Sequence, residues 1–172
     1  SQVIGALKDC DLFISGGGSL LQDATSFRSL IYYLAIISLA KRYRRKVMIL
    51  GQGIGPLRRS ISRRLVGRTL TGVDLITVRD AQSAELLGQM GIGQVKVTAD
   101  PTFTLDPCPE DESLSLLNEV GLSAEDDIIA VSLRRLDYLP GIPDFGPDAI
   151  AALAAKELPA KLLLIGMQSP DD

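Results

Sequence analysis

The residues with the clearest chemical potential are consecutive glycines that directly follow a short apolar run. Gly16, Gly17 and Gly18 are followed by Ser19. Glycine allows a tight turn in which a ligand can approach the backbone closely, and free N–H groups at a helix start favour an anionic ligand. The turn is not a dinucleotide fingerprint, because Leu21 stands where that motif needs glycine, nor a P-loop, which needs Gly-Lys-Ser/Thr. A strand–helix turn that binds nothing is the alternative.

An arginine side chain is predicted at the end of another strand, at a position like that of the glycine turn. Arg79 follows another apolar run, and Asp80 begins a helix directly after it. A guanidinium at the carboxyl end of a buried strand can hold a carboxylate or a phosphate through two hydrogen bonds. The alternative is a structural pair between Arg79 and Asp80 or Asp100. For Asp100, which ends a further run, we expect a capping or orienting role rather than a chemical one.

Two further residues are candidates for binding the same ligand. Gln52 lies in the glycine-spaced turn GQGIGP, where it can donate and accept hydrogen bonds at the edge at which α/β folds bind ligands. Arg134 ends a later run, in which alternation places it on the same side as Ser132, toward a cleft between domains. A purely structural turn and a surface arginine are the respective alternatives.

Composition excludes several classes of site. The 172 residues contain no histidine, which excludes a Ser-His or Cys-His nucleophile pair and a histidine-ligated metal in this chain. Cys10 and Cys108 have neither metal-ligand nor redox spacing, so we expect no metal and no cofactor. The net charge of −3 gives no general attraction to nucleic acid. The sequence alone therefore does not identify a catalytic residue.

Short apolar runs alternate with helical segments and must position these candidates. Runs without polar alternation are typical of strands covered on both faces, and their alternation with helices predicts an α/β fold with a Rossmann-like, doubly wound parallel sheet flanked by helices. Asp80 is expected to cap a helix that ends near Gly91. Strands are expected at residues 12–15, 47–50, 75–78, 95–98, 128–133 and 161–165, and further helices at residues 23–44, 60–71, 113–120 and 147–158.

Prolines and a run of acidic residues interrupt this alternation. We therefore predict a first domain at residues 1–104, an interdomain connection at residues 105–126, and the start of a second Rossmann-like domain at residues 127–172. The second domain would end after two strands and one helix, which are too few to bury their own sheet. The chain is thus expected to be part of a larger two-domain protein.

Two basic clusters stand out in the first domain. We interpret them as solvated helical faces, and the first lies at a helix C-terminus, where cations are favoured. The alternative is peripheral contact with lipid phosphates or another polyanion at a membrane surface. The clusters are Lys41, Arg42, Arg44, Arg45 and Lys46, and Arg58, Arg59, Arg63, Arg64 and Arg68.

Taken in order, five motifs resemble the polysaccharide pyruvyl transferases, closest to the bacterial cell-wall branch. They are DLFISGGGSLLQD, VMILGQGIGP, VDLITVRD, VKVTADPTF and VSLRRL, and the likeness covers residues 11–136 and 161–168. The resemblance implies a two-domain fold similar to the GT-B glycosyltransferases. It also implies a cytoplasmic enzyme, at the inner face of the plasma membrane if the basic clusters contact lipid. Its substrates would be phosphoenolpyruvate and a hexosamine-containing cell-wall polysaccharide or lipid-linked precursor, and its product a pyruvate ketal.

On this likeness Arg79 is a donor-binding arginine and Arg134 a second one. The reaction it implies needs no metal: the donor methylene is protonated, a sugar hydroxyl attacks, phosphate leaves and a second hydroxyl closes the ring. The family's first strand and the later part of its second domain, with the catalytic acid, are not in this sequence, so we expect the fragment alone to be inactive. A nucleotide-sugar glycosyltransferase of the same shape and a degenerate sensor or scaffold domain are the alternatives, because a fold does not determine chemistry.

Overall fold

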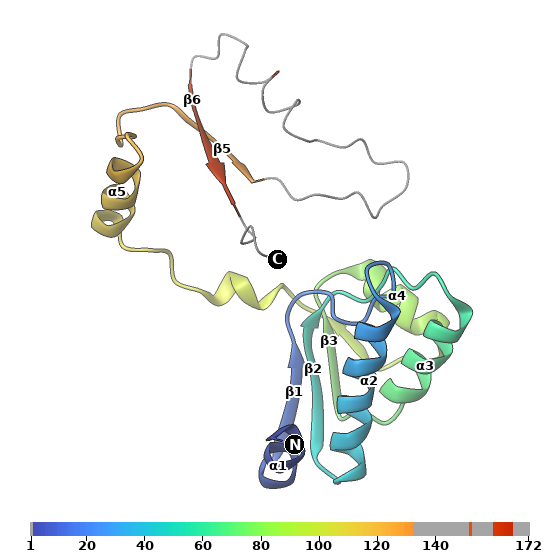
Figure 1. The fold of residues 1–172 in the computed structure, drawn as a ribbon. Coiled ribbons are helices and arrows are strands. Elements are labelled where there is room, and N and C mark those ends of the chain that lie inside the picture. The colour runs from blue at the N-terminus through green and yellow to red at the C-terminus, as the bar shows by residue number, and fades with distance from the viewer. Residues whose placement is uncertain (1, 133–151, 153–159, 167–172) are drawn as a thin grey trace. The chain divides into compact units, whose positions relative to one another are not determined.

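The computed structural model describes residues 2–132, 152 and 160–166, and it divides the chain into two units (Figure 1). The first unit comprises Ser1–Leu105 and the second Asp106–Asp172. The acidic run and two of the prolines that interrupt the sequence pattern therefore lie at the beginning of the second unit.

The first unit is built on a parallel four-stranded sheet in which helices connect the strands. This confirms the α/β prediction of a parallel sheet flanked by helices. Its strand order is β1-β2-β3-β4, the order of the strands in the chain. The elements are α1 (Gln2–Asp9), β1 (Leu12–Gly16), α2 (Phe27–Arg42), β2 (Lys46–Gln52), α3 (Ser60–Leu70), β3 (Leu75–Val78), α4 (Ala81–Gln89), β4 (Val95–Val97) and the 3-10 helix η1 (Pro101–Thr104).

The three connecting helices α2, α3 and α4 lie on one face of this sheet (Figure 1). Right-handed crossovers that add each new strand on the same side return the chain over the same face every time. Within the described residues the sheet is therefore wound in one direction, where the sequence predicted a doubly wound sheet. The consequence is visible in β1, because Leu12 and Ile14 are exposed while Ser15 is buried.

The core of the first unit lies between the sheet and these helices. Leu30, Leu34 and Ile37 recur at helical spacing on α2 and are buried together with Val47 and Ile49 of β2. Burying one such side chain contributes about 1.5–3 kcal/mol. The candidate residues lie at the ends of these strands, and the packed core between the sheet and the helices holds the strands in place.

Helix α2 begins later than the sequence indicates. The apolar periodicity predicts a start at Asp23, but the helix begins at Phe27, and its N-cap Ser26 accepts a hydrogen bond from the Ser29 N–H at 3.2 Å. Upstream, the Gln22 side-chain oxygen accepts hydrogen bonds from two following N–H groups. These local bonds hold the segment in a turn instead of a helix.

Helix α4 has the ends that the sequence predicts. Asp80 Oδ1 accepts a hydrogen bond from the Ser83 N–H at 2.7 Å, so Asp80 is the N-cap. Gly91 follows the helix with a φ of 83°, a conformation that favours glycine. Helix α3 matches its predicted range to within one residue.

The second unit contains a parallel pair of strands and one helix among the described residues. The helix starts three residues before its predicted start, because its acidic first turn is favourable next to the positive end of the helix dipole. Its elements are α5 (Glu110–Glu119), β5 (Ile128–Ser132) and β6 (Lys161–Ile165). Arg134 and, apart from residue 152, the predicted helix at residues 147–158 lie outside the described residues. None of the described helices is long and apolar enough to cross a bilayer.

Candidate functional site

The carboxyl ends of the four strands in the first unit bring together residues that are far apart in the sequence. Arg79 Nη2 donates a hydrogen bond to Ser19 Oγ at 2.9 Å, although 60 positions separate the two residues. Arg79 Nη1 donates to Asp100 Oδ2 at 2.8 Å. The glycine turn after β1 and the arginine after β3 therefore share one edge, as expected when parallel strands end side by side.

The Arg79 guanidinium is oriented by its neighbours without being enclosed by them. Its side chain is 36% exposed, and its Nε lies 3.9 Å from Asp80 Oδ2. A guanidinium has five N–H donors, of which two form the hydrogen bonds to Ser19 and Asp100. The ion pair with Asp100 that the sequence allows as an alternative role is present. Among the described residues, the other three N–H donors, including the Nε–H near Asp80, form no hydrogen bond.

Asp100 has the structural role that the sequence predicts. It is the N-cap of η1, and its Oδ1 accepts hydrogen bonds from the Thr102 N–H at 3.1 Å and the Thr102 hydroxyl at 3.0 Å. The hydrogen bond from Arg79, followed by those from Thr102, lowers the pKa of the Asp100 carboxyl below its ordinary value. The carboxylate therefore stays charged and fixes the direction of the guanidinium.

Gly53 is a member of this site that sequence reasoning passed over. Its N–H donates to the Gly18 carbonyl at 2.9 Å, which joins the two glycine turns. A Cβ at this position would lie 2.7 Å from Ser19 Oγ and 3.0 Å from Arg79 Nε and Nη2. Only glycine leaves room for the hydroxyl and the guanidinium to meet in this arrangement, and the signal for it was the Gly-x-Gly-x-Gly spacing that begins at the end of β2.

The glycine turn itself is shaped by backbone conformation. Gly17 and Gly18 have φ values of 73° and 58°, in the left-handed region that glycine tolerates best. The Gly17 N–H donates to the Leu50 carbonyl at 3.1 Å. Because α2 begins only at Phe27, the turn does not lead directly into a helix N-terminus, and the predicted anion site at a helix start is not formed here. The cation at this edge is Arg79.

Gln52 lies behind the edge. Its side chain is fully buried, and its Nε2 donates to Ser15 Oγ at 3.2 Å, which ties β2 to β1. Its Oε1 has no hydrogen-bond partner among the described residues. The backbone carbonyl of Gln52 also accepts a hydrogen bond from the Arg79 N–H at 3.3 Å. Gln52 thus supports the arginine, and direct contact with a ligand stays a prediction.

Asp23 connects the glycine turn to the start of α3. Its two carboxylate oxygens accept hydrogen bonds from the Arg58 N–H at 2.7 Å and the Arg59 N–H at 3.1 Å. Burial on its own raises the pKa of this carboxyl, but the Ser62 hydroxyl and the two N–H groups outweigh burial and lower it. The two segments are therefore held together by a charged cap.

An open cavity of about 320 Å³ lies beside Arg79. Its volume is at the lower end of the range for small-ligand sites. Its wall includes the Ser83 hydroxyl, which accepts a hydrogen bond from the Ile54 N–H at 2.8 Å. Within the described ranges no cluster of three or more Asp, Glu, Cys or His side chains is arranged to hold a metal. The lining residues are Ser19, Gly53, Ile54, Gly55, Pro56, Arg79, Asp80, Gln82, Ser83 and Leu86.

Comparison with known proteins identifies the family. The family model for polysaccharide pyruvyl transferase matches residues 3–161. No curated protein and no solved structure matches the chain. The matched range contains both glycine turns, Arg79 and Asp100, and it extends over most of the sequence. The chain therefore belongs to the polysaccharide pyruvyl transferase family.

Proposed function

We propose that the protein transfers the pyruvyl group of phosphoenolpyruvate to a hexosamine-containing cell-wall polysaccharide or its lipid-linked precursor in the bacterial cytoplasm, forming a pyruvate ketal. The observation that supports the proposal is the Arg79 guanidinium, which is oriented by Ser19 and Asp100 at the edge of the cavity and has three N–H donors without a hydrogen bond among the described residues. Phosphoenolpyruvate carries a carboxylate and a phosphate, which are the groups that a guanidinium binds through paired hydrogen bonds.

In this proposal each residue at the edge has a separate task. Arg79 binds one anionic group of the donor, and Ser19 lines the same cavity. The Gly17–Gly18 backbone is proposed to contact the donor from the neighbouring turn. Gly16 and Gly53 keep the turns close together, and Gln52 supports them from behind. Arg134 is proposed as the second donor-binding arginine. A further expectation is a GT-B-like arrangement, in which the first unit is the N-terminal Rossmann-like domain and the second unit begins the C-terminal one.

The proposed reaction conserves atoms without a redox step. A proton adds to the methylene carbon of phosphoenolpyruvate, and C2 becomes electron-poor. One sugar hydroxyl bonds to C2 and loses its proton. The C2–O bond to phosphate then breaks, inorganic phosphate leaves, and a second hydroxyl closes the ketal with loss of its own proton. An arginine that binds the donor carboxylate or phosphate positions C2 for both attacks.

The proposal is tested by donor binding to the complete protein. Phosphoenolpyruvate should raise the melting temperature, and Arg79→Gln should weaken this binding about 100-fold or more, because it removes a charged, oriented donor pair. Arg63→Gln is the matched control, since it removes the same charge from α3, and it should bind like the unmodified protein. Stabilisation by a nucleotide sugar instead of phosphoenolpyruvate would show that the donor is misassigned.

Turnover provides the second measurement. The complete protein should release inorganic phosphate from phosphoenolpyruvate when a lipid-linked hexosamine acceptor is added, and release should depend on Arg79. Absence of phosphate release with every hexosamine acceptor would contradict the proposed reaction even if phosphoenolpyruvate binds.

A further inference from the structure

The charge of the chain is divided very unevenly. Residues 24–73 contain eleven Lys and Arg residues and no Asp or Glu, whereas the rest of the chain contains the other seven basic residues and all 21 acidic ones. This acid-free segment forms α2, β2 and α3. Helices α2 and α3 contact each other and lie on one face of the sheet (Figure 1), so the basic residues of these two helices lie on the same side of the first unit.

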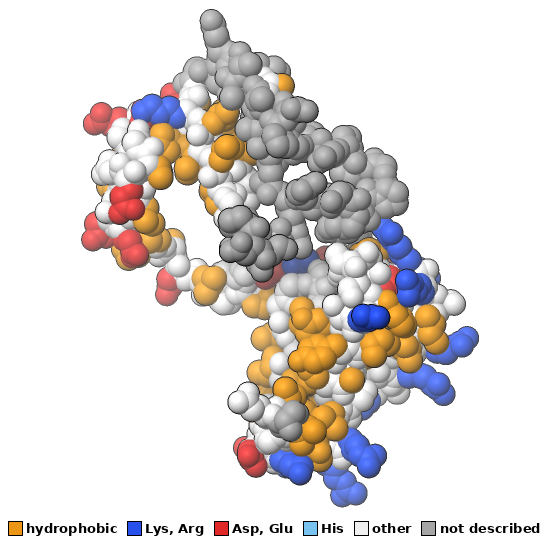
Figure 2. Space-filling model, viewed as in Figure 1, with side chains coloured by type: hydrophobic (Ala, Val, Ile, Leu, Met, Phe, Trp, Pro, Cys, Tyr) orange, Lys and Arg blue, Asp and Glu red, His pale blue; other side chains and the backbone are white. Residues whose placement is uncertain are grey.

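The outward surface of α2 carries a short apolar stripe, with the exposed Ser29 before it and the exposed Ser38 after it. Ile31 and Tyr32 are 38% and 55% exposed, and Ala35, one turn further along, is exposed as well. Arg28 and Arg42 lie at the two ends of this stripe. Figure 2 shows the same arrangement, with hydrophobic side chains over this part of the first unit and Lys and Arg side chains around them. A water-facing helix normally carries polar residues there.

The outward ridge of α3 is basic with one apolar residue. Ile61 is 43% exposed, and Arg64 and Arg68 follow it at intervals of three and four residues, so the three lie on one face of the helix. The ion pairs among the described residues include none of the arginines of α3. The positive charge of this ridge is therefore not neutralised by the part of the protein that the structure describes.

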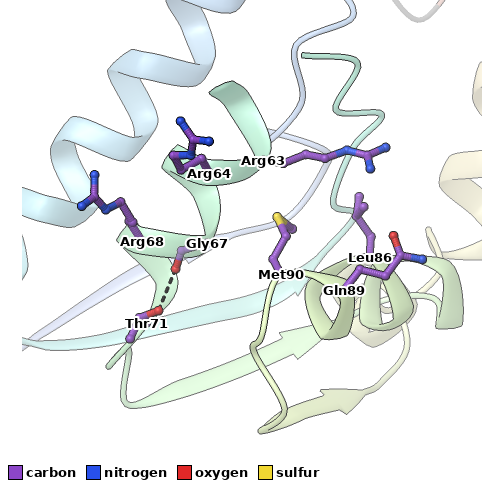
Figure 3. Close-up of a pocket in the computed structure, with 8 residues that line it drawn as sticks. All are labelled: Arg63, Arg64, Gly67, Arg68, Thr71, Leu86, Gln89 and Met90. Atoms are coloured by element: carbon purple, nitrogen blue, oxygen red, sulfur yellow. Dashed lines mark hydrogen bonds between the residues drawn. The ribbon is translucent and has the colours of Figure 1, made fainter. Parts of the chain in front are cut away.

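A hollow of about 350 Å³ lies between α3 and α4. The directions of the arginine side chains around it indicate which kind of anion this region suits. Arg63, Arg64 and Arg68 all line this hollow. Figure 3 shows that Arg63 extends toward α4, whereas the guanidinium groups of Arg64 and Arg68 are directed to the other side of α3. The opposite wall consists of Leu86, Gln89 and Met90. The cations do not converge on the hollow, which is unlike a site for one small phosphate. They are instead spread over the outside of the helix.

Spread cations beside exposed apolar side chains match the surface of an anionic bilayer. Arg and Lys approach lipid phosphates, while Tyr and aliphatic side chains enter the interface. A second copy of the chain is an unsuitable partner for this face, because a self-complementary contact would bring two acid-free basic surfaces together. A soluble polyanion would use the arginines and leave the apolar stripe in water.

We propose that this face, defined by Ile31 and Tyr32 on α2 and by Ile61, Arg64 and Arg68 on α3, docks the protein onto a membrane containing anionic phospholipid. Docking itself is independent of the reaction at Arg79. Its use, to bring the cavity to a lipid-linked acceptor, rests on the proposed function.

Vesicle co-sedimentation of the complete protein tests this proposal. The protein should bind vesicles of phosphatidylglycerol and phosphatidylcholine in equal parts, and not vesicles of phosphatidylcholine alone. Arg64→Gln together with Arg68→Gln should raise the lipid concentration for half-binding about 30-fold. Lys8→Gln with Lys96→Gln, which removes the same charge from exposed positions outside α2 and α3, is the matched control and should change it less than about threefold.

A second variant separates a bilayer from a soluble polyanion. Ile31→Ser with Tyr32→Ser should weaken vesicle binding at least about fivefold, because it removes apolar surface that enters the interface. Three outcomes would each overturn the proposal. They are no binding of the protein to anionic vesicles, an equal loss of affinity in the Arg64/Arg68 variant and the Lys8/Lys96 control, and an Ile31/Tyr32 variant that binds vesicles as well as the unmodified protein. Phosphate release with a water-soluble acceptor should be the same in the Arg64/Arg68 variant as in the unmodified protein, so a failure of docking is distinguishable from a failure of the proposed reaction.

Discussion

The arginine at the sheet edge and the arginines on α3 are the same residue type in opposite environments. Arg79 is held by a hydroxyl and a carboxylate from two other strand ends, and Gly53 makes space for it. Arg64 and Arg68 extend from one helix face, with no carboxylate partner among the described residues. An arginine of fixed direction suits a small anion of defined shape, whereas exposed arginines spread along a helix suit a diffuse negative surface.

The largest effect that would sharpen this comparison is expected at Gly53. In Gly53→Ala the new Cβ must push aside Ser19 Oγ and the Arg79 guanidinium, which are the ends of side chains able to move. We therefore expect the melting temperature to change little but phosphoenolpyruvate to bind at least about 30-fold more weakly, because these atoms orient the donor. Isothermal titration with phosphoenolpyruvate measures the loss.

Gly88→Ala is the matched control for this substitution. Gly88 lies in α4, and nothing is within 4 Å of the Cβ that it would gain. Equal donor affinity in Gly53→Ala and the unmodified protein would show that the direction of Arg79 does not matter. The contrast between the oriented Arg79 and the exposed arginines of α3 would then have no functional meaning.

The next largest effect is expected at Asp23, which links the two regions. Asp23→Asn keeps the shape of the side chain but removes the charge that accepts the Arg58 and Arg59 N–H bonds, at a cost of about 1–3 kcal/mol in the free energy of unfolding. Asp106→Asn is the control, because the Asp106 carboxyl is exposed and forms no hydrogen bond among the described residues. It should lower the free energy of unfolding by less than about 0.5 kcal/mol. Urea unfolding at neutral pH measures both.

The same carboxyl predicts a pH dependence. Because folding lowers the pKa of Asp23 below 3.8, its contribution is fully present above the unfolded-state value and is lost as the pH falls through the folded-state value. The difference in unfolding free energy between the unmodified protein and Asp23→Asn should therefore shrink in acid below about pH 4. A difference that stays constant down to acid denaturation would contradict the role of the charge.

The smallest effect concerns salt. Raising the ionic strength from about 0.1 M to about 1 M shortens the Debye length from about 10 Å to about 3 Å. Binding to anionic vesicles should fall about tenfold or more, because exposed arginines act on lipid through water. Donor affinity should fall less, since Arg79 contacts the donor directly. Equal salt dependence of the two, measured by sedimentation and by titration, would remove the distinction between the regions.

The Arg79 site shows how far sequence reasoning reached. The glycine turn, Arg79 and Asp100 each follow an apolar run, and parallel strands end at one edge, so their meeting could be predicted. The close packing at Gly53 could not be predicted, because it depends on how near two loops come in the folded chain, where the Gly53 N–H lies 2.9 Å from the Gly18 carbonyl oxygen. The start of α2 was also missed, since the Gln22 and Ser26 hydrogen bonds compete with the apolar periodicity.

By itself the sequence determined the family motifs, the alternation of strands and helices, and the confinement of positive charge to residues 24–73, because these properties depend on residue type and spacing along one chain. The tertiary structure decided which face of the sheet the helices cover, which donors of Arg79 are used, and where the α3 arginines point. These depend on crossover handedness and on contacts between segments distant in sequence, which no local pattern records.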